Sequence, residues 1–228
     1  LDFEIIENMY EYESFSIERM YIAKKDHLPY ELRKVTFEYF KMKTELKGVE
    51  GQEYFYMKSK NRINSIFGMM VTAIERSCDI KKALEDYYKA PNSFLPYQWG
   101  VWVTAYARYR LNKMREKQRI RTVYNDTDSL KGINYNKEIF DEENKLIIQQ
   151  CKENEIPLFA YNKKGEIQYM MVWDHDAHYE RFKTLGAKKY VYDERNKKGE
   201  LEFHITISGV DKKKGAERIG CVENFDVA

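Results

Sequence analysis

Two aspartates separated by one threonine occur in the stretch VYNDTDSLKG, residues 123–132. Ile120 to Tyr124 include β-branched and aromatic residues, so a strand is predicted to reach this point. Charge is expensive to bury in a sheet, and the two carboxylates therefore need an explanation. Asn and Asp often close hairpins, which favours a turn. Residues two apart on a strand project to one side, so a metal site at Asp126 and Asp128 is the alternative to the turn, which this stretch alone favours.

A second group of polar residues lies in KNRINSIFG, residues 60–68. Lys60, Asn64, Phe67 and Gly68 recur at i, i+4, i+7 and i+8, which places them on one helical face. This face would offer an ammonium group, an amide, an aromatic ring and a bare backbone patch. Glycine destabilises a helix by about 1 kcal/mol relative to alanine, which suggests close approach by another body at Gly68. A packing contact explains it equally well, and an ordinary amphipathic helix also fits the pattern.

The surrounding sequence predicts an α+β fold in which helices and strands are mixed along the chain. Apolar residues at helical spacing predict two long helices joined by the turn sequence GVEG, and hence an antiparallel helical pair. The C-terminal third is rich in alternating β-formers, with NKKG as a turn between its last two strands. Predicted helices cover about 2–12, 30–48, 52–74, 99–117 and 136–154, with a strand at 13–24 and an irregular segment at 75–98.

The composition of the 228-residue chain narrows the possible classes of protein. The 39 basic and 37 acidic residues give a net charge of +2, so the overall charge does not indicate a polyanion-binding protein. Basic residues concentrate locally at 41–62 and 108–121, interleaved with aromatics, which suits a nucleic-acid surface or a solvated helix face. Three widely spaced cysteines give no zinc motif and fit a reducing compartment. Without a signal peptide or a membrane-length apolar run, the sequence predicts a cytoplasmic protein with no membrane partner.

Four sequence motifs together resemble those of family-B DNA polymerases, in the order in which that family carries them. KNRINSIFG resembles the KxxxNSxYG motif, and VYNDTDS resembles the YxDTDS motif. TAYAR, residues 104–108, resembles the Tx2AR signature of the protein-primed phage and plasmid branch. LGAKKYVY resembles the KxY motif. The resemblance extends over nearly the whole chain and is weakest at 133–172.

The resemblance implies that the carboxylates of the DTD sequence are catalytic metal ligands. In this family two divalent ions, Mg²⁺ or Mn²⁺, activate the primer 3′-hydroxyl and stabilise the leaving pyrophosphate. Asp128 corresponds to the ligand that touches both ions, and Asp126 corresponds to a nearby supporting carboxylate. The metal interpretation is then preferred over the turn, although a hairpin bend can coexist with it.

The resemblance also implies roles on the predicted helical pair. Lys60 would bind the triphosphate of the incoming deoxynucleotide, and Asn64 would shape the nucleotide pocket. Phe67 stands where the family usually has tyrosine, so ring stacking is kept and a hydroxyl is lost. Lys43 is a weaker candidate for the path of the triphosphate, and a solvated lysine is the preferred interpretation.

Further positions are implied to contact primer–template DNA. Thr104 and Arg108, one turn apart on a helix, would hold the DNA backbone. Lys188 and Tyr190, on one face of a strand, would hold the primer terminus. A terminal protein acting as primer is a further partner that the protein-primed branch implies.

The resemblance divides the chain into four parts of a polymerase. Residues 1–29 would end an upstream palm or insertion region, and 30–74 would form the fingers helices. Residues 75–98 would be a short insertion at the position of a second terminal-protein region. Residues 99–228 would form the C-terminal palm and end where a thumb begins. The implied fold is a palm β-sheet with packed helices plus an antiparallel helical fingers hairpin.

Other family motifs are not found in the 228 residues. The DxxSLYP motif, which carries another metal-binding aspartate, and the 3′–5′ exonuclease motifs do not occur, and the chain starts at Leu1 rather than at methionine. We therefore expect a fragment of a DNA-directed DNA polymerase from a phage or plasmid that is inactive by itself. A catalytically incomplete, polymerase-like nucleic-acid-binding module is the alternative. A reverse transcriptase fits less well, because its corresponding motif ends in adjacent aspartates.

Overall fold

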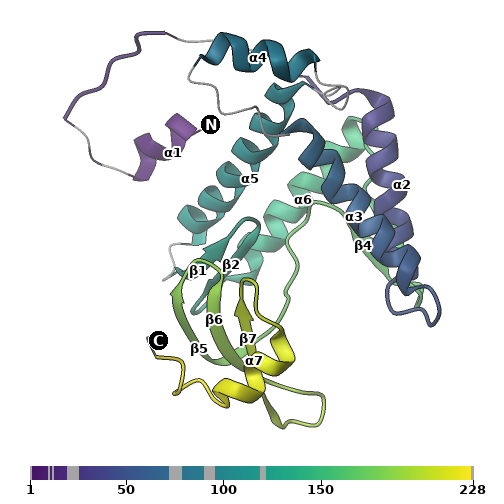
Figure 1. Ribbon diagram of the computed structural model, residues 1–228, viewed down its shortest axis with the longest axis vertical. Helices are drawn as coiled ribbons and strands as arrows, with labels where there is room; N and C mark the ends of the chain where they lie inside the picture. Colours follow the sequence, from purple (N-terminus) through teal and green to yellow (C-terminus); the bar gives the residue numbers. More distant parts are fainter. Residues whose placement is uncertain are drawn as a thin grey trace. The chain divides into compact units, whose positions relative to one another are not determined.

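The computed structural model describes residues 2–9, 11, 13–19, 26–71, 79–89, 96–118 and 122–226. Helices are mixed with small antiparallel sheets, so the predicted α+β class is confirmed (Figure 1). The chain forms two compact units. Unit 1 comprises Leu1–Gln118 and Asn136–Trp173, and unit 2 comprises Arg119–Tyr135 and Asp174–Ala228.

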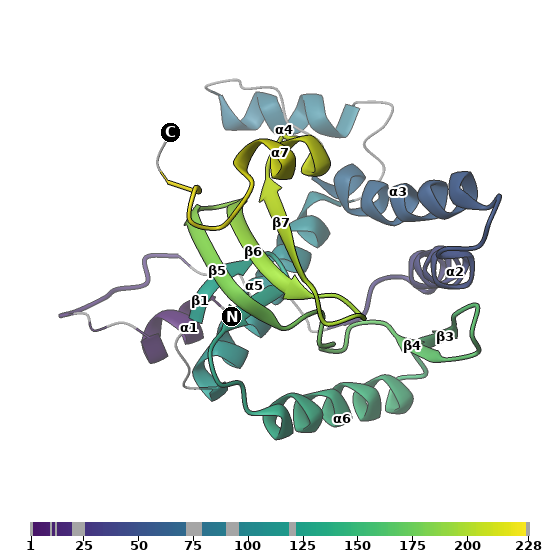
Figure 2. The ribbon, with the colours of Figure 1, turned by 90° about the horizontal axis from the view of Figure 1, so that it is seen from below.

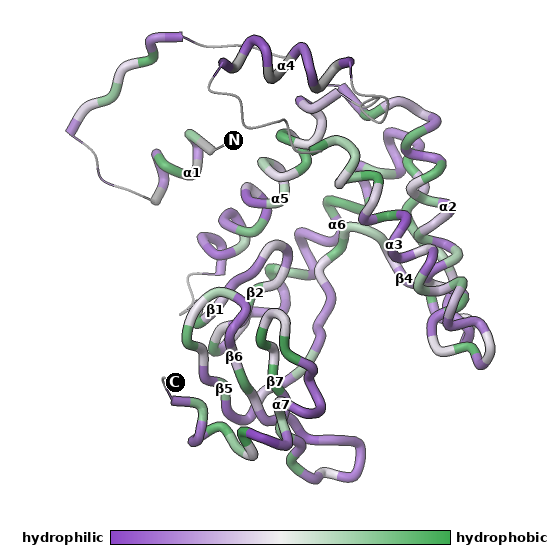
Figure 3. Tube along the Cα trace, in the orientation of Figure 1, coloured by the Kyte–Doolittle hydropathy of each residue, from purple (hydrophilic) through white to green (hydrophobic). Residues whose placement is uncertain are grey.

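Unit 1 contains the predicted helical pair. Helices α2 (Tyr30–Leu46) and α3 (Glu53–Met70) are joined by a short turn and pack against each other; Figure 2 shows α2 nearly end-on and α3 lying across the view. Hydrophobic and hydrophilic residues alternate along both helices (Figure 3), as expected when one side of a helix packs and the other faces water. Gly48 and Gly51 in the connecting turn have φ of 70° and 75°, a left-handed conformation that glycine adopts without strain.

Helix α5 (Tyr97–Gln118) is the longest helix of unit 1 and crosses the end of α3. A Cβ atom added to Gly100 would lie 2.4 Å from Val71 Cγ1 and 3.1 Å from Met70 Cβ. The lack of a side chain at Gly100 therefore permits the close approach of the two helices. Leu111 and Met114 on α5 are buried.

The rest of unit 1 follows the DTD stretch in sequence. Helix α6 (Lys137–Glu153) begins at Asn136, whose side chain accepts a hydrogen bond from the Glu138 amide at 2.9 Å, as an N-cap does. Strands β3 (Phe159–Tyr161) and β4 (Ile167–Tyr169) form an antiparallel hairpin, and β3 packs beside α2. A small core joins α6 to this hairpin through Ile147, Cys151 and Leu158.

Two predictions of local structure in the N-terminal half of the chain are wrong, as far as the described residues show. Residues 13–19 contain no strand, and 20–24 lie outside the described residues. The segment expected to be irregular contains helix α4 (Ile80–Lys89), while the short helix α1 (Asp2–Met9) agrees with the prediction. Asp79 Oδ1 accepts hydrogen bonds from the amides of Lys81 and Lys82 at 2.9 and 3.3 Å, so α4 has a capped N-terminus. The prolines at 91 and 96 follow α4 in sequence rather than interrupting it.

Unit 2 consists of a β-hairpin and a three-stranded sheet. Strands β1 (Thr122–Asp126) and β2 (Ser129–Gly132) form the hairpin. Strands β5 (Tyr179–Gly186), β6 (Lys189–Arg195) and β7 (Leu201–Ile207) form the sheet in the order β5-β6-β7, all antiparallel. Asn196 forms the predicted NKKG turn between β6 and β7, where its Oδ1 accepts from the amides of Lys198 and Glu200.

Helix α7 (Lys212–Ile219) covers one face of the three-stranded sheet. The core between them contains Val191, Ile205, Val222 and Phe225. A Cβ atom on Gly215 would lie 2.2 Å from Ile205 Cδ1, so α7 approaches β7 closely through this glycine. The opposite face of β6 carries Tyr190 and Tyr192 and is half-buried.

The two units differ from the divisions that the sequence suggested. The predicted palm begins at residue 99, whereas α5, α6 and the β3–β4 hairpin belong with the helical pair in unit 1. Unit 2 is assembled from two separate stretches of chain on either side of α6. Among the described residues, no helix has both the length and the apolar character that crossing a membrane requires.

Candidate functional site

The DTD sequence forms the tip of the β1–β2 hairpin. Asp126 pairs with Ser129, which leaves Thr127 and Asp128 as a two-residue turn. The turn expected from the Asn and Asp content is therefore present. Thr127 has φ of 53°, which is strained for a β-branched residue, and Asp128 is exposed to solvent. The tip thus presents one exposed carboxylate on a conformationally strained turn.

Asp126 is bound by a lysine from a distant part of the sequence. Lys188 Nζ lies 2.6 Å from Asp126 Oδ2, and Thr127 Oγ1 donates to Asp126 Oδ1 at 3.0 Å. The hydrogen bond from Lys188 lowers the pKa of the Asp126 carboxyl, with a smaller contribution from Thr127. Asp126 is therefore held in the ionised form.

Lys188 lies in the turn between β5 and β6 rather than on a strand as predicted. Gly186 pairs with Lys189, which leaves Ala187 and Lys188 as a two-residue turn, and Lys188 has φ of 56°. The backbone N–H of Lys188 donates to the hydroxyl of Tyr124 at 2.9 Å. Backbone and side chain of Lys188 thus both contact the β1–β2 hairpin, and the two turns of unit 2 are joined.

An aromatic cluster lies beside these joined turns. The ring of Tyr190 lies 5.0 Å from that of Tyr124 and 5.3 Å from that of Phe182. Lys131 Nζ lies 5.3 Å from the ring centroid of Tyr190 and 5.6 Å from that of Tyr179, a cation–π geometry with two rings. Lys131 and Tyr124 were not among the predicted site residues, although counting back from a two-residue turn pairs these two residues across the hairpin.

The carboxylates of the hairpin tip fit a magnesium ion only in part. Magnesium is usually bound by one or two carboxylates together with water and substrate phosphates. Asp128 supplies an exposed carboxylate of this kind, whereas Asp126 is already paired with Lys188. Within the described ranges no cluster of three or more His, Cys, Asp or Glu side chains could hold a metal ion. The oxygen donors suit Mg²⁺ or Mn²⁺ if phosphate oxygens complete the coordination.

The predicted helical face is present on α3 in unit 1. Lys60, Asn64 and Gly68 are exposed along this face, and Phe67 is half-buried at its edge. A Cβ atom added to Gly68 would have no neighbour within 4 Å among the described residues. Packing against the described residues therefore does not require glycine at this position, and close approach by another body stays one of the two interpretations.

Lysines of the helical pair form a concentration of positive charge around Lys60. Burial lowers the pKa of Lys43, and the charges of Lys47 and Lys60 lower this pKa further. Lys43 is half-buried, with Nζ 5.4 Å from the ring centroid of Phe40, so it is less solvated than the sequence suggested. Three neighbouring cations from α2, α3 and their connecting turn favour the binding of an anion.

The predicted DNA-binding residues of α5 lie one turn apart, as expected. Arg108 is exposed, and Thr104 is half-buried. Thr104 Oγ1 donates to the carbonyl of Val101 at 2.8 Å, so its hydroxyl hydrogen is used within the helix. Only the acceptor lone pairs of Thr104 then remain to bind a ligand.

Comparison with known proteins gives no family for this chain. No protein-family model, curated protein or solved structure matches it.

The structure brings the predicted site residues together in two groups. In unit 2, Asp126, Lys188 and Tyr190 gather around Tyr124, with Asp128 next to them on the hairpin tip. In unit 1, the predicted nucleotide-binding face lies on α3 and the predicted DNA-binding pair lies on α5.

Proposed function

We propose that this chain carries the nucleotide-binding and metal-binding residues of a DNA-directed DNA polymerase that adds deoxynucleotides to a primer 3′ end. The observation that supports this most strongly is the contact between Lys188 and Asp126, 62 residues apart in sequence. These residues belong to two motifs that were selected from sequence alone. A chance resemblance gives no reason for the two motifs to be in direct contact.

In this proposal unit 2 supplies the side chains for the metal ions and the primer. Asp128 holds a Mg²⁺ or Mn²⁺ ion together with phosphate oxygens, and such an ion, when bound, neutralises charge on the reacting phosphate. Lys188 keeps Asp126 ionised and fixes the hairpin tip. The half-buried ring of Tyr190 lies beside Tyr124 of this hairpin, and we propose that it contacts the primer terminus.

Unit 1 supplies the side chains for the incoming nucleotide. Lys60 binds the triphosphate, assisted by the positive charge of Lys43 and Lys47. Asn64 and Phe67 contact the sugar and base, and the bare backbone at Gly68 lets the nucleotide approach α3 closely. Thr104 and Arg108 contact the DNA backbone, as the resemblance implies. Phage or plasmid replication with a terminal protein as primer is the setting that the same motifs imply.

The alternative is a nucleic-acid-binding module that retains the polymerase shape without its catalysis. One observation favours this alternative: Asp126 is paired with Lys188, and the described residues contain no set of three metal-ligating side chains. Such a module would bind DNA but would have no use for an exposed Asp128 beside nucleotide phosphates.

Nucleotide binding by the chain in the presence and absence of Mg²⁺ separates the two functions. Titration calorimetry with a deoxynucleoside triphosphate should show binding that Mg²⁺ strengthens. Asp128→Asn should abolish the strengthening by Mg²⁺, because the variant keeps the shape of the side chain and loses the charge that holds the ion. Asp126→Asn should have the smaller effect. Magnesium-independent binding by the unaltered chain, or an unchanged response in Asp128→Asn, would favour the non-catalytic module.

A further inference from the structure

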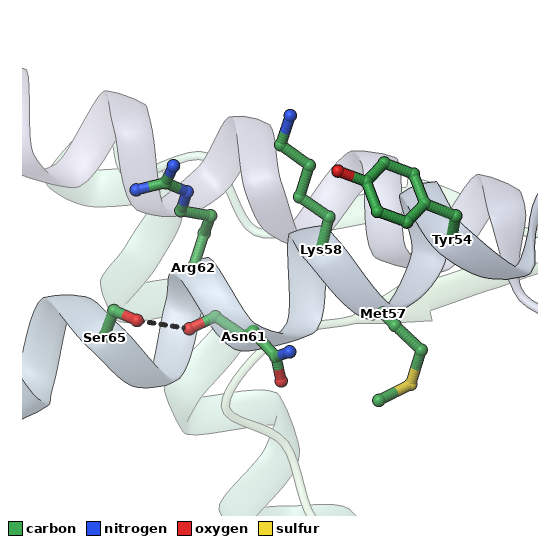
Figure 4. A pocket seen from close by; sticks show the side chains of 6 residues that line it. All are labelled: Tyr54, Met57, Lys58, Asn61, Arg62 and Ser65. Atoms are coloured by element: carbon green, nitrogen blue, oxygen red, sulfur yellow. Dashed lines mark hydrogen bonds between the residues drawn. The ribbon is translucent and has the colours of Figure 1, made fainter.

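A shallow groove runs along one side of α3 and is not used by the proposed nucleotide site. Its walls come from a single helix (Figure 4), with the lining residues Tyr54, Met57, Lys58, Asn61, Arg62 and Ser65. Residues two apart on a helix point about 200° apart, so Lys58 and Lys60 project from nearly opposite sides. The cations of the groove and the ammonium group of Lys60 therefore lie on different sides of α3.

The charge of this groove is not neutralised within the described part of the chain. Neither Lys58 nor Arg62 forms an ion pair there, whereas Lys41 pairs with Glu45 on α2. Figure 4 shows Arg62, Lys58 and Tyr54 projecting to the same side of the helix. Two cations one turn apart, neither paired with a carboxylate among the described residues, favour a ligand with repeated negative charge.

An exposed aromatic ring adjoins the two cations. The side chain of Tyr54 is 69% exposed, and Lys58 Nζ lies 5.9 Å from the centroid of its ring. An aromatic ring this exposed contributes little to packing and can stack on a base. Ser65 Oγ donates a hydrogen bond to the backbone carbonyl of Asn61 at 2.8 Å. The side-chain amide of Asn61 takes no part in this bond and adds a polar group to the groove.

We propose that this face of α3 binds single-stranded DNA. Phosphates would bind Lys58 and Arg62, and a base would stack on Tyr54, which is the combination that proteins use for single strands without sequence preference. A duplex keeps its bases stacked inside and cannot use Tyr54 in this way. The surface is separate from the proposed nucleotide site and needs no metal ion, so it can be tested independently.

The test is binding of fluorescently labelled oligothymidylate to the full chain, followed by anisotropy at several salt concentrations. The double variant Lys58→Ala/Arg62→Ala should bind more weakly, and the slope of log affinity against log salt should fall by about 1.4, or 0.7 for each lost phosphate contact. Tyr54→Leu should weaken binding roughly five- to hundredfold, and Tyr54→Phe, which keeps the ring, should bind like the unaltered chain.

Lys41→Ala/Lys89→Ala is the matched control, because it removes the same net charge from lysines that pair with Glu45 and Glu85. This control should bind the oligonucleotide nearly as well as the unaltered chain. Equal weakening in both double variants, or no change in Lys58→Ala/Arg62→Ala, would overturn the proposal. Those results would leave the magnesium-dependent binding of nucleotides untouched, so the two proposals fail separately.

Discussion

Individual residues at the hairpin tip combine a structural role with a proposed chemical one. Thr127 and Lys188 both have positive φ without being glycine, and each lies in a two-residue turn. Such conformations persist where surrounding contacts determine them, and here the contacts are the bonds from Lys188 to Asp126 and Tyr124. The sequence suggested Asp126 and Lys188 as site residues but did not predict the bond between them, because pairing between residues 62 apart depends on how the two turns fold back.

The ion pair between Asp126 and Lys188 should make stability depend on pH. The hydrogen bond from Lys188 lowers the pKa of Asp126 in the folded chain below its unfolded pKa of about 3.9. The ion pair therefore stabilises the fold above about pH 3.9, and this stabilisation is lost as the pH falls through the folded pKa. The same bond raises the pKa of Lys188, so that part of the stabilisation is lost only at strongly alkaline pH. Thermal unfolding of Asp126→Asn should show a lower midpoint than the unaltered chain at pH 7, and this difference should shrink as the pH falls below about 4. A difference that stays constant as the pH falls would contradict the pairing.

At the scale of elements, the periodicity of apolar residues was sufficient to predict the position of a helix or strand where that element is long. The helical pair, α5, α6 and the strands β6 and β7 were predicted at nearly their observed positions. Helix α4 was missed because two nearby prolines suggested an irregular segment, although they follow it in sequence. Strand β4 begins the stretch IQYMMVW, residues 167–173, which the sequence predicts as a strand, although only its first three residues are in β4. Strand β3 was not predicted, because three residues are too short to establish an alternation pattern, and it packs against α2.

Replacement by alanine should change the stability of the chain in opposite directions at two glycines that lie in helices. Gly68→Ala should stabilise the chain by up to about 1 kcal/mol, because the added methyl group has open space and alanine favours the helix. The same change should weaken nucleotide binding if the nucleotide approaches the backbone there. Gly100→Ala is the matched comparison and should destabilise by about 1–3 kcal/mol, because its Cβ would overlap Val71. Urea unfolding and nucleotide titration of both variants measure these effects, and a Gly68→Ala variant that binds nucleotide normally would contradict the proposed approach.

At the scale of the whole molecule, the sequence predicted the class of fold but not how the chain divides into units. Unit 2 takes the DTD hairpin from one part of the chain and the three-stranded sheet from another, with α6 and the β3–β4 hairpin inserted between them and assigned to unit 1. Such a division follows from long-range packing, which local periodicity does not record.

Primer extension by the chain alone should be very slow. The described residues include no third carboxylate beside Asp126 and Asp128, and the motif that would carry it in the resembling family does not occur in the sequence. The assay is incubation with primed template, deoxynucleotides and Mg²⁺ or Mn²⁺, with products separated by electrophoresis. Steady extension by the purified chain would show that its own residues complete the metal site.

The most direct test of the central claim is the affinity of each of the four deoxynucleoside triphosphates for the chain and its Lys60→Ala and Phe67→Ala variants, with Mg²⁺ present. Lys60 is proposed to bind phosphates that all four nucleotides share, so Lys60→Ala should weaken all four alike, by about ten- to a hundredfold. Phe67 is proposed to contact base and sugar, so Phe67→Ala should weaken the four unequally, and Phe67→Tyr should be tolerated. If Lys60→Ala leaves the affinities unchanged or alters only the preference among the four nucleotides, α3 does not bind the triphosphate and the proposed function is contradicted.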